Sequence, residues 1–279
     1  MTYPLIVVHL DAGPRCAARV AVAARLAQGG AGRLLGIAPT GLPDMIVSMS
    51  SAVPDAIELI ALSAATLREN AEAAAAAFEQ HCRAAGLPSF EARIVVDDAV
   101  EALVHHGRCS DLIVTGQTDL ALPVAGVPAD LPQQVLLHAG PPVLVVPCTG
   151  RIGAIGRRIL VAWKNTREAA RALRDALPLL RQAEHVSLVE VGAVPLEASP
   201  DDSLLAASAW LAAHGVAFEA HREIELAGVG DQLLTRAGEI GADLIVSGGY
   251  GHSRLREWAL GGVTRHLLGH MTLPTLFSH

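Results

Sequence analysis

The sequence predicts two α/β domains in tandem, each built on a doubly wound, five-stranded parallel sheet. Its 279 residues suffice for two domains of ordinary size. The segment DLIVTG at 111–116 recurs as DLIVSG at 243–248, a spacing of 132 residues that fits a duplicated domain and is too long for a solenoid repeat. Short apolar runs alternate with longer helical patterns in both halves, which is typical of βαβ units.

These patterns predict five strands and four helices in each half. We expect strands near 4–10, 33–38, 91–96, 111–115 and 143–146, and then near 158–163, 185–191, 217–222, 243–247 and 275–278. We expect helices near 15–28, 55–85, 99–108 and 131–138, and then near 167–181, 203–214, 229–240 and 262–270. In a doubly wound sheet ligands bind at the carboxyl ends of the strands, so the candidate sites follow the first and fourth strands of each half.

The two domains are expected at 1–149 and 157–279. Between them, residues 147–156 contain Gly150, Gly153 and Gly156 with arginines nearby, which indicates a short exposed linker. The first strands, LIVV at 5–8 and ILVA at 159–162, are about 154 residues apart, more than the repeat spacing. The first domain therefore carries an insertion, which we place near 39–61.

Composition excludes several classes of function. The net charge of −7 argues against nucleic acid as a partner. The four cysteines, at 16, 82, 109 and 148, have no C-x-x-C spacing, so we expect reduced thiols and no zinc site. No apolar run reaches the ~20 residues of a membrane span, and no basic signal segment is visible at the start. We therefore expect a cytoplasmic protein with no membrane partner.

A glycine-rich segment follows the fourth predicted strand of the second half. Gly248 and Gly251 come directly after the strand, and Gly261-Gly262-Val263-Thr264 opens the next predicted helix. Glycines let the backbone approach an anion closely, and a helix N-terminus directs free N–H groups at it. The Thr264 hydroxyl adds a donor. The pattern predicts a phosphate site, although it lacks the lysine of a Walker A loop.

The G-x2-G-x9-G spacing is similar to the nucleotide loop of the universal stress protein family, and the runs 249–257 and 273–279 resemble its tandem bacterial members. The resemblance implies a Rossmann-like, adenine nucleotide α-hydrolase-like fold, bound ATP or AMP with Mg²⁺ only as a companion of the nucleotide, and a role in the stress response. Gly262 stands where the family usually has Ser or Thr. The predicted binding residues are Trp163, Lys164, Ser247, Gly248, Gly251, His252, Gly261, Gly262, Val263 and Thr264.

The first strand of the second half ends differently from the family pattern. The family commonly has an acidic residue there, which the resemblance implies would contact the adenine, whereas this chain has Lys164. An ammonium group cannot accept a hydrogen bond from an amino group. Lys164 either faces a phosphate or carboxylate of the ligand or is simply solvated at the strand end.

The matching segment of the first half has lost the glycine pattern. Asp119 replaces the second glycine, and prolines at 123, 128 and 132 remove backbone donors. Asp11 keeps the acidic residue at the end of the first strand. We expect this half to bind nucleotide poorly or not at all, and to have a structural or regulatory role.

Three functions remain open at this stage. The first is a nucleotide-binding regulatory module, the second is a dimerisation or interaction scaffold with an empty loop, and the third is a slow ATPase. We expect no enzyme beyond a weak ATPase, because no nucleophile elbow or metal-binding motif is visible. His266 and His270 are spaced like a metal pair but lack a third ligand, so surface or packing histidines are the preferred interpretation. We expect the halves to form an intramolecular pseudo-dimer in which the fifth strands, near Val146 and Ser278, meet. Association of two chains into a homodimer is a further interaction that the sequence leaves open.

Overall fold

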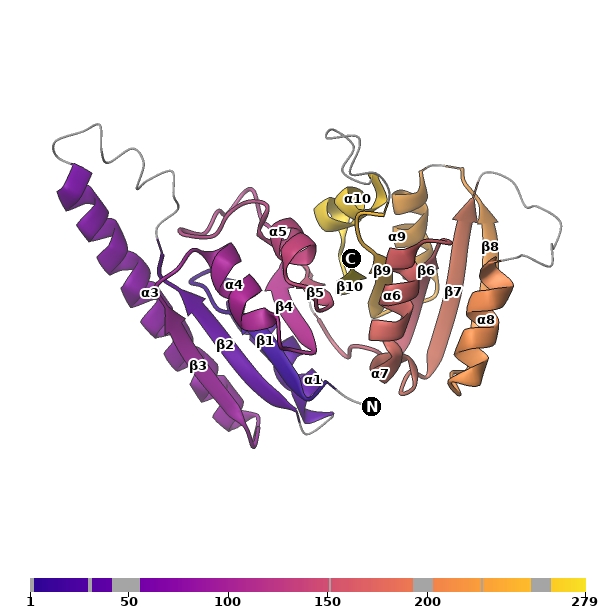
Figure 1. The fold of residues 1–279 in the computed structure, drawn as a ribbon, viewed down its shortest axis with the longest axis horizontal. Coiled ribbons are helices and arrows are strands. Elements are labelled where there is room, and N and C mark those ends of the chain that lie inside the picture. The colour runs from indigo at the N-terminus through magenta and orange to yellow at the C-terminus, as the bar shows by residue number, and fades with distance from the viewer. Residues whose placement is uncertain are drawn as a thin grey trace. The chain divides into compact units, whose positions relative to one another are not determined.

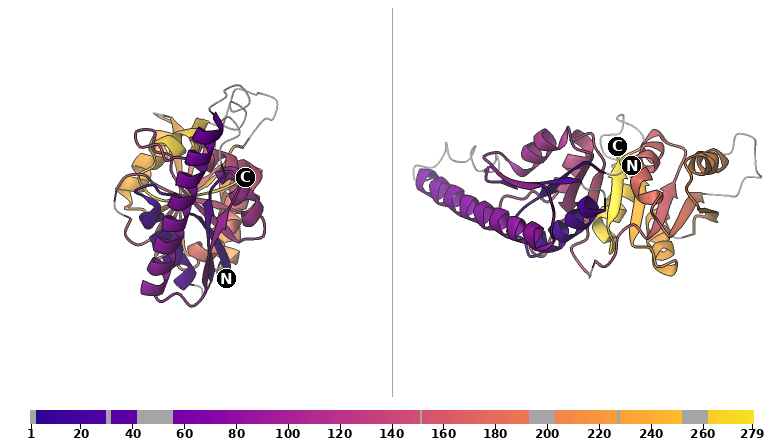
Figure 2. Two further views of the ribbon diagram at one scale, coloured as in Figure 1. Left: turned by 90° about the vertical axis from the view of Figure 1, so that its left-hand side faces the viewer. Right: turned by 90° about the horizontal axis from the view of Figure 1, so that it is seen from below.

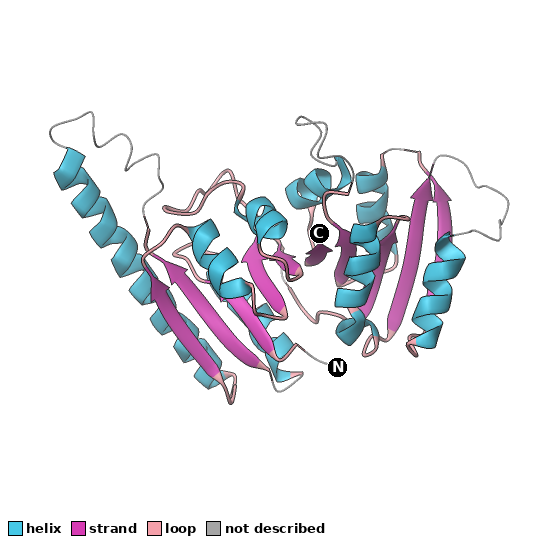
Figure 3. Ribbon diagram, viewed as in Figure 1, coloured by secondary structure: helices cyan, strands magenta, loops and turns pink. Residues whose placement is uncertain are grey.

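The structure is a computed structural model that describes residues 3–29, 32–41, 56–150, 152–192, 203–226, 228–251 and 262–279. The chain divides into two compact units, one that ends at Pro141 and one that begins at Pro142. Each is a mainly parallel sheet with helices on both of its faces, as the colouring in Figure 3 shows. The predicted tandem α/β architecture is therefore confirmed. Most of the predicted insertion, residues 42–55, lies outside the described residues.

The first unit has four parallel strands in the order β3-β2-β1-β4. Helices α1 and α3 cover one face of this sheet and α4 and α5 the other, as the views in Figures 1 and 2 agree. The strands are β1 (Leu5–His9), β2 (Arg33–Pro39), β3 (Phe90–Val95) and β4 (Leu112–Gly116). The helices are α1 (Cys16–Gln28), α3 (Ala56–Ala84), α4 (Ala99–Gly107) and α5 (Leu131–His138).

The second unit has the strand order β5-β10-β9-β6-β7-β8. Helices α9 and α10 lie on one face of its sheet and α6 and α8 on the other (Figure 2). The strands are β5 (Val143–Val146), β6 (Arg158–Trp163), β7 (His185–Gly192), β8 (Glu219–Ile224), β9 (Leu244–Gly248) and β10 (Thr275–Ser278). The helices are α6 (Arg167–Asp175), α7 (Leu177–Leu180), α8 (Ser203–Ala213), α9 (Val229–Glu239) and α10 (Gly262–His270).

Strand β5 belongs to the second compact unit, although it follows the last helix of the first. It pairs antiparallel with β10, with Val145 opposite Thr275 and Leu144 opposite Leu276. The two fifth strands thus meet, as the sequence analysis expects. The compact division lies before β5, upstream of the linker that composition indicates, because strand pairing rather than glycine content decides where a packed unit ends.

The central strands β1, β4, β6 and β9 are buried along almost their whole length, which is why they read as continuous apolar runs. Helix ends are also capped. The Thr166 hydroxyl accepts a hydrogen bond from the Ala169 N–H at 3.2 Å at the start of α6, and Gly86 has the positive φ of a helix stop after α3. Among the described residues, no helix is both long and apolar enough to cross a bilayer.

The prediction of one continuous helix over 167–181 is wrong. The segment 167–181 forms two helices, α6 and α7, which are separated at Ala176. Pro178 lies just after the break; it has no N–H to donate to the preceding turn, and its ring would clash with the carbonyl four residues earlier.

Helix α3 is anchored to its sheet by Phe78. This side chain is 1% exposed and meets Phe90 of β3 edge-on, with ring centroids 6.3 Å apart. A Cβ at Gly36 of β2 would lie 3.2 Å from the Phe78 ring, so the glycine makes room for it.

Replacing Phe78 by alanine should lower the free energy of unfolding by about 3–5 kcal/mol, because it empties a fully buried aromatic site. Chemical denaturation would measure the change. The control is Leu62→Ala on the same helix, where the side chain is 66% exposed and the expected change is within about 0.5 kcal/mol. Equal effects of the two substitutions would contradict this account of how α3 is held.

Candidate functional site

A cavity of about 430 Å³ lies at the carboxyl ends of the strands in the second unit. It is the place where a doubly wound sheet offers a ligand site. Eight of the ten predicted site residues line it: Trp163, Lys164, Ser247, Gly248, Gly251, Gly262, Val263 and Thr264. The other two, His252 and Gly261, lie outside the described residues. The structure therefore brings the ends of β6 and β9 and the start of α10 around one space.

One wall of the cavity is apolar. It is formed by Val189 and Val191 of β7 and by Val229 and Leu233 of α9. Val189 and Leu233 also belong to a buried core cluster with Leu160, and Val191 and Val229 pack against that cluster. This wall is therefore held rigid by the hydrophobic core.

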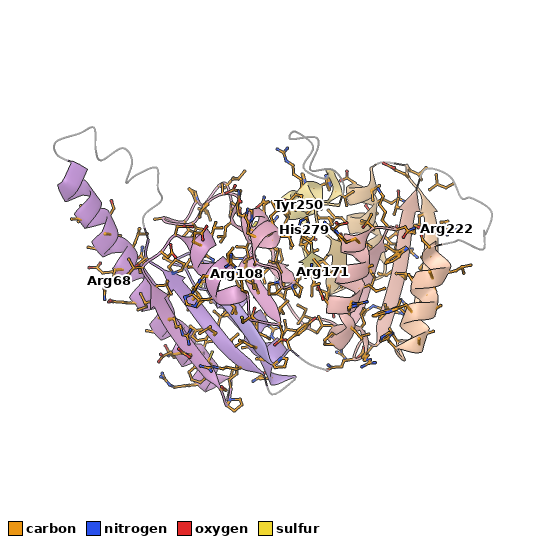
Figure 4. All side chains as sticks on the ribbon, viewed as in Figure 1. Arg68, Arg108, Arg171, Arg222, Tyr250 and His279 are labelled. Atoms are coloured by element: carbon orange, nitrogen blue, oxygen red, sulfur yellow. The ribbon has the colours of Figure 1, made fainter. Side chains whose placement is uncertain are left out.

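A second part of the lining is built from the end of β9, the loop after it and the start of α10. The Tyr250 N–H donates to the Thr264 hydroxyl at 3.1 Å, and the Gly249 N–H donates to the Ser278 carbonyl at 2.8 Å. A ring nitrogen of His279 lies 3.1 Å from the Gly249 carbonyl; Figure 4 labels Tyr250 and His279. Thr264 thus orients the loop, a role that the sequence analysis did not assign to it.

Tyr250 has a φ of +54°, in the left-handed region that non-glycine residues rarely adopt. The hydrogen bond to Thr264 holds it there, so the loop has a defined backbone shape.

Gly248, Gly251 and Gly262 differ in what a side chain would meet at each position. A Cβ at Gly248 would lie 2.6 Å from the backbone nitrogen of Ala169, so this glycine allows β9 to approach the first turn of α6. A Cβ at Gly251 would lie 2.9 Å from a carboxylate oxygen of Glu168. Among the described residues, none has an atom within 4 Å of a Cβ placed at Gly262.

Alanine should affect the free energy of unfolding differently at Gly248 and at Gly262. Gly248→Ala should cost about 1–3 kcal/mol of unfolding free energy, because a helix backbone cannot move away cheaply. Gly262→Ala should be neutral or stabilise slightly, since alanine is the better helix former. Urea unfolding of both variants measures this, and a neutral Gly248→Ala would contradict the close approach.

Three polar side chains that line the cavity are not among the predicted site residues: Thr166, Glu168 and Glu225. Thr166 and Glu168 lie in the first turn of α6, the helix that follows β6. Helices that follow parallel strands start at the edge of the sheet where ligands bind. The sequence signal for these residues is therefore their position within one turn after Lys164.

Glu168 is a buried carboxylate in this wall, and only 5% of the residue is exposed. Its Oε1 accepts a hydrogen bond from the Arg167 Nε at 2.7 Å. Burial by itself raises the pKa of Glu168, but hydrogen bonds from Arg167 and from its own backbone, with the Arg167 charge, hold that pKa below its ordinary value. Glu168 is therefore ionised at neutral pH.

The first unit has a different arrangement at the matching place. Asp11, retained after β1, is engaged inside the protein: its Oδ1 accepts from the Gly13 N–H at 2.9 Å, and its Oδ2 lies 2.8 Å from the Arg19 guanidinium. Arg19 also donates to the His9 carbonyl at 2.7 Å. A Cβ at Gly116, the counterpart of Gly248, would lie 2.6 Å from Arg19 Nη1. Arg19 thus occupies the space beside Gly116 and neutralises Asp11.

The proline-containing loop of the first unit packs onto its own domain. Val124 lies against Gly13, and Leu67 of α3 lies against Gly126. A cavity of about 380 Å³ is present in this unit; the loop after β1, which includes Asp11, forms it together with α1 and α3, and none of the residues 116–123 that match the second-half loop line it. These contacts support the expectation that the first half does not form the same site.

Burial of His9 predicts a loss of stability in acid. The ring is 1% exposed; burial and then the nearby Arg19 charge lower its pKa from 6.5 to about 4, against a smaller opposing effect of Asp11. In the unfolded chain the His9 ring therefore becomes protonated below about pH 6.5, whereas in the folded chain it stays neutral down to about pH 4.

Stability should fall by about 3 kcal/mol between pH 7 and pH 4 through this residue. Urea unfolding across that range should show the decrease for the native chain and a flatter profile for His9→Leu. Identical pH profiles of the two proteins would contradict the buried neutral imidazole.

Metal binding has no assembled site in the described part of the chain, where no group of three or more His, Cys, Asp or Glu side chains is placed to hold an ion. The rings of His266 and His270 stack with centroids 4.3 Å apart, and His266 Nε2 lies 3.0 Å from Asp231 Oδ1. This histidine pair therefore packs α10 against α9.

The fold and the cavity define a tandem, doubly wound α/β protein with a ligand site at the carboxyl edge of its second sheet. Residues 156–279 match the model of the universal stress protein family. The resemblance inferred from the glycine loop is thus confirmed for the second domain.

Solved structures extend the similarity in fold to the whole chain. A universal stress protein from Archaeoglobus fulgidus DSM 4304 superimposes with a TM-score of 0.72 at 17% identity, over 98% of this chain and 95% of that chain. A putative universal stress protein from Pseudomonas aeruginosa UCBPP-PA14 gives 0.62 at 17% identity, over 99% and 93%. A family protein from Arabidopsis thaliana with AMP bound covers 43% of this chain and 90% of its own, at 17% identity and a TM-score of 0.33. No curated protein matches the chain.

Proposed function

We propose that the second domain binds an adenine nucleotide or a related phosphorylated ligand, and that the chain acts as a binding and regulatory module in the stress response. The observation that carries the proposal is the convergence of eight predicted residues on one cavity of about 430 Å³. That volume lies within the range of small-molecule sites, about 300–1,000 Å³.

The apolar wall suits a planar base. It offers the aliphatic surface of Val189 and Val191 from β7 and of Val229 and Leu233 from α9. Lys164 cannot accept from an adenine amino group, but Glu225, at the end of β8, can. Its N–H is bonded to the Gly192 carbonyl at 2.8 Å, which holds it beside the end of β7.

The opposite end suits a phosphate group. The N-terminus of α10 begins at Gly262, where unsatisfied N–H groups and the helix dipole favour an anion. Lys164 is exposed at the rim of the same cavity and supplies a cation for the ligand or its phosphate. No atom of the described residues lies within 4 Å of a Cβ placed at Gly262, which leaves room on that side for the ligand to approach the helix.

The first experiment is to purify the full chain without added nucleotide, denature it and analyse the released small molecules by mass spectrometry. A stoichiometric adenine nucleotide is the expected result. Calorimetric titration should then show that an adenine nucleotide binds, and incubation with ATP should release no phosphate, which separates a module from an ATPase. An empty protein with no thermal shift at millimolar nucleotide would refute the proposal and favour the interaction scaffold.

Restoring the hydroxyl that the family usually has at position 262 should strengthen binding. Gly262→Ser places an O–H donor at the start of α10, where a Cβ would meet no other described residue within 4 Å. A hydrogen bond to a charged phosphate corresponds to roughly a tenfold gain in affinity. The matched control is Gly262→Ala, which adds the Cβ alone. Equal affinities of the two variants for AMP would show that the phosphate does not sit at this helix end.

A further inference from the structure

The carboxylate of Glu168 faces the glycine loop in which the phosphate is expected. Its Oε2 lies 2.9 Å from the position of a Cβ on Gly251, and the residue lines the cavity. The Thr166 hydroxyl lies 3.7 Å from the same position. The first turn of α6 therefore forms the wall opposite Gly251, and it presents a buried acid there.

The ion pair with Arg167 does not remove this charge from the cavity. Arg167 is 77% exposed on its side-chain surface and binds Oε1, whereas Oε2 is the oxygen beside Gly251. The positive end of the pair is therefore screened by water, and the negative end is turned toward the loop.

The lining carries more acid than base. Among the described residues that line the cavity, Lys164 is the cation and Glu168 and Glu225 are the carboxylates. The N-terminus of α10 adds a partial positive charge. Together these groups can balance a small negative charge on a ligand, but each added phosphate brings more charge next to a carboxylate that water does not screen.

We propose that Glu168 determines the charge selectivity of the second-domain cavity, so that it accepts a nucleoside or nucleoside monophosphate and rejects a nucleoside triphosphate. The proposal rests on the proposed function and specifies its ligand class. A carboxylate in this place can accept hydrogen bonds from ribose hydroxyls, as acidic residues do in other doubly wound domains. Adenosine, AMP, ADP and ATP all have the ribose hydroxyls that Glu168 can accept from. The repulsion between Glu168 and the ligand grows with the number of phosphates, and this difference makes the cavity selective.

The test is to measure the affinities of the full chain for adenosine, AMP, ADP and ATP by calorimetry, without Mg²⁺, which would neutralise the phosphates. The native chain should bind AMP at least about tenfold more tightly than ATP. Glu168→Gln keeps the size of the side chain and removes the charge. It should raise ATP affinity by about tenfold and leave adenosine within about twofold.

Glu225→Gln is the matched control, because it removes the charge of an exposed carboxylate that lines the same cavity and keeps an amide oxygen that can accept from the adenine amino group. It should change the ratio of ATP to AMP affinity by less than about threefold, since solvent screens that charge. Thermal unfolding of each variant checks that it is folded. Equal changes for all four ligands in Glu168→Gln would show a structural role and overturn the proposal. So would ATP binding as tightly as AMP to the native chain. If no member of the series binds either protein, the proposed function falls as well.

Discussion

The close approach of β9 to the first turn of α6 is the constraint on which the second-domain site depends. Without a side chain at Gly248, the end of the strand reaches the backbone at Ala169. That contact brings Thr166 and Glu168 beside Gly251 and closes one side of the cavity. The loop that follows is then held by Thr264, Ser278 and His279. The glycine pattern therefore has a packing role as well as the proposed role in ligand binding, and a larger residue at 248 would disturb both.

The two halves show how a duplicated domain can keep its scaffold and change its site. Each repeat has a DLIV-type strand that ends in glycine, Gly116 in one and Gly248 in the other. Beside Gly116 lies the buried Arg19 guanidinium, paired with Asp11, where the second half has the start of α6 and a cavity. A buried charge is costly unless it is paired, so the ion pair and the hydrogen bond to the His9 carbonyl stabilise one another. Substitutions at the edge of the sheet thus changed the site without changing the strand order.

The cavity joins two physically different environments. Its apolar wall continues the core cluster of Leu160, Val189 and Leu233, and so its shape is set by side-chain packing. Its polar wall is set by backbone hydrogen bonds around Tyr250, whose left-handed conformation needs that support. A ligand with a flat apolar part and a polar end matches this division.

The architecture follows from the amino-acid sequence, because buried parallel strands read as apolar runs and the 132-residue repeat reveals the duplication. The sequence also locates the cavity at the ends of β6 and β9 and the start of α10, since the ends of parallel strands share one edge of the sheet. Only the tertiary structure decided that Glu168 faces Gly251, that Arg19 fills the space beside Gly116, and that β5 pairs with β10. These outcomes depend on which groups meet between elements that lie about 80 to 130 residues apart in the chain. Local propensity and spacing carry no information about such contacts, because the chain must fold before they exist.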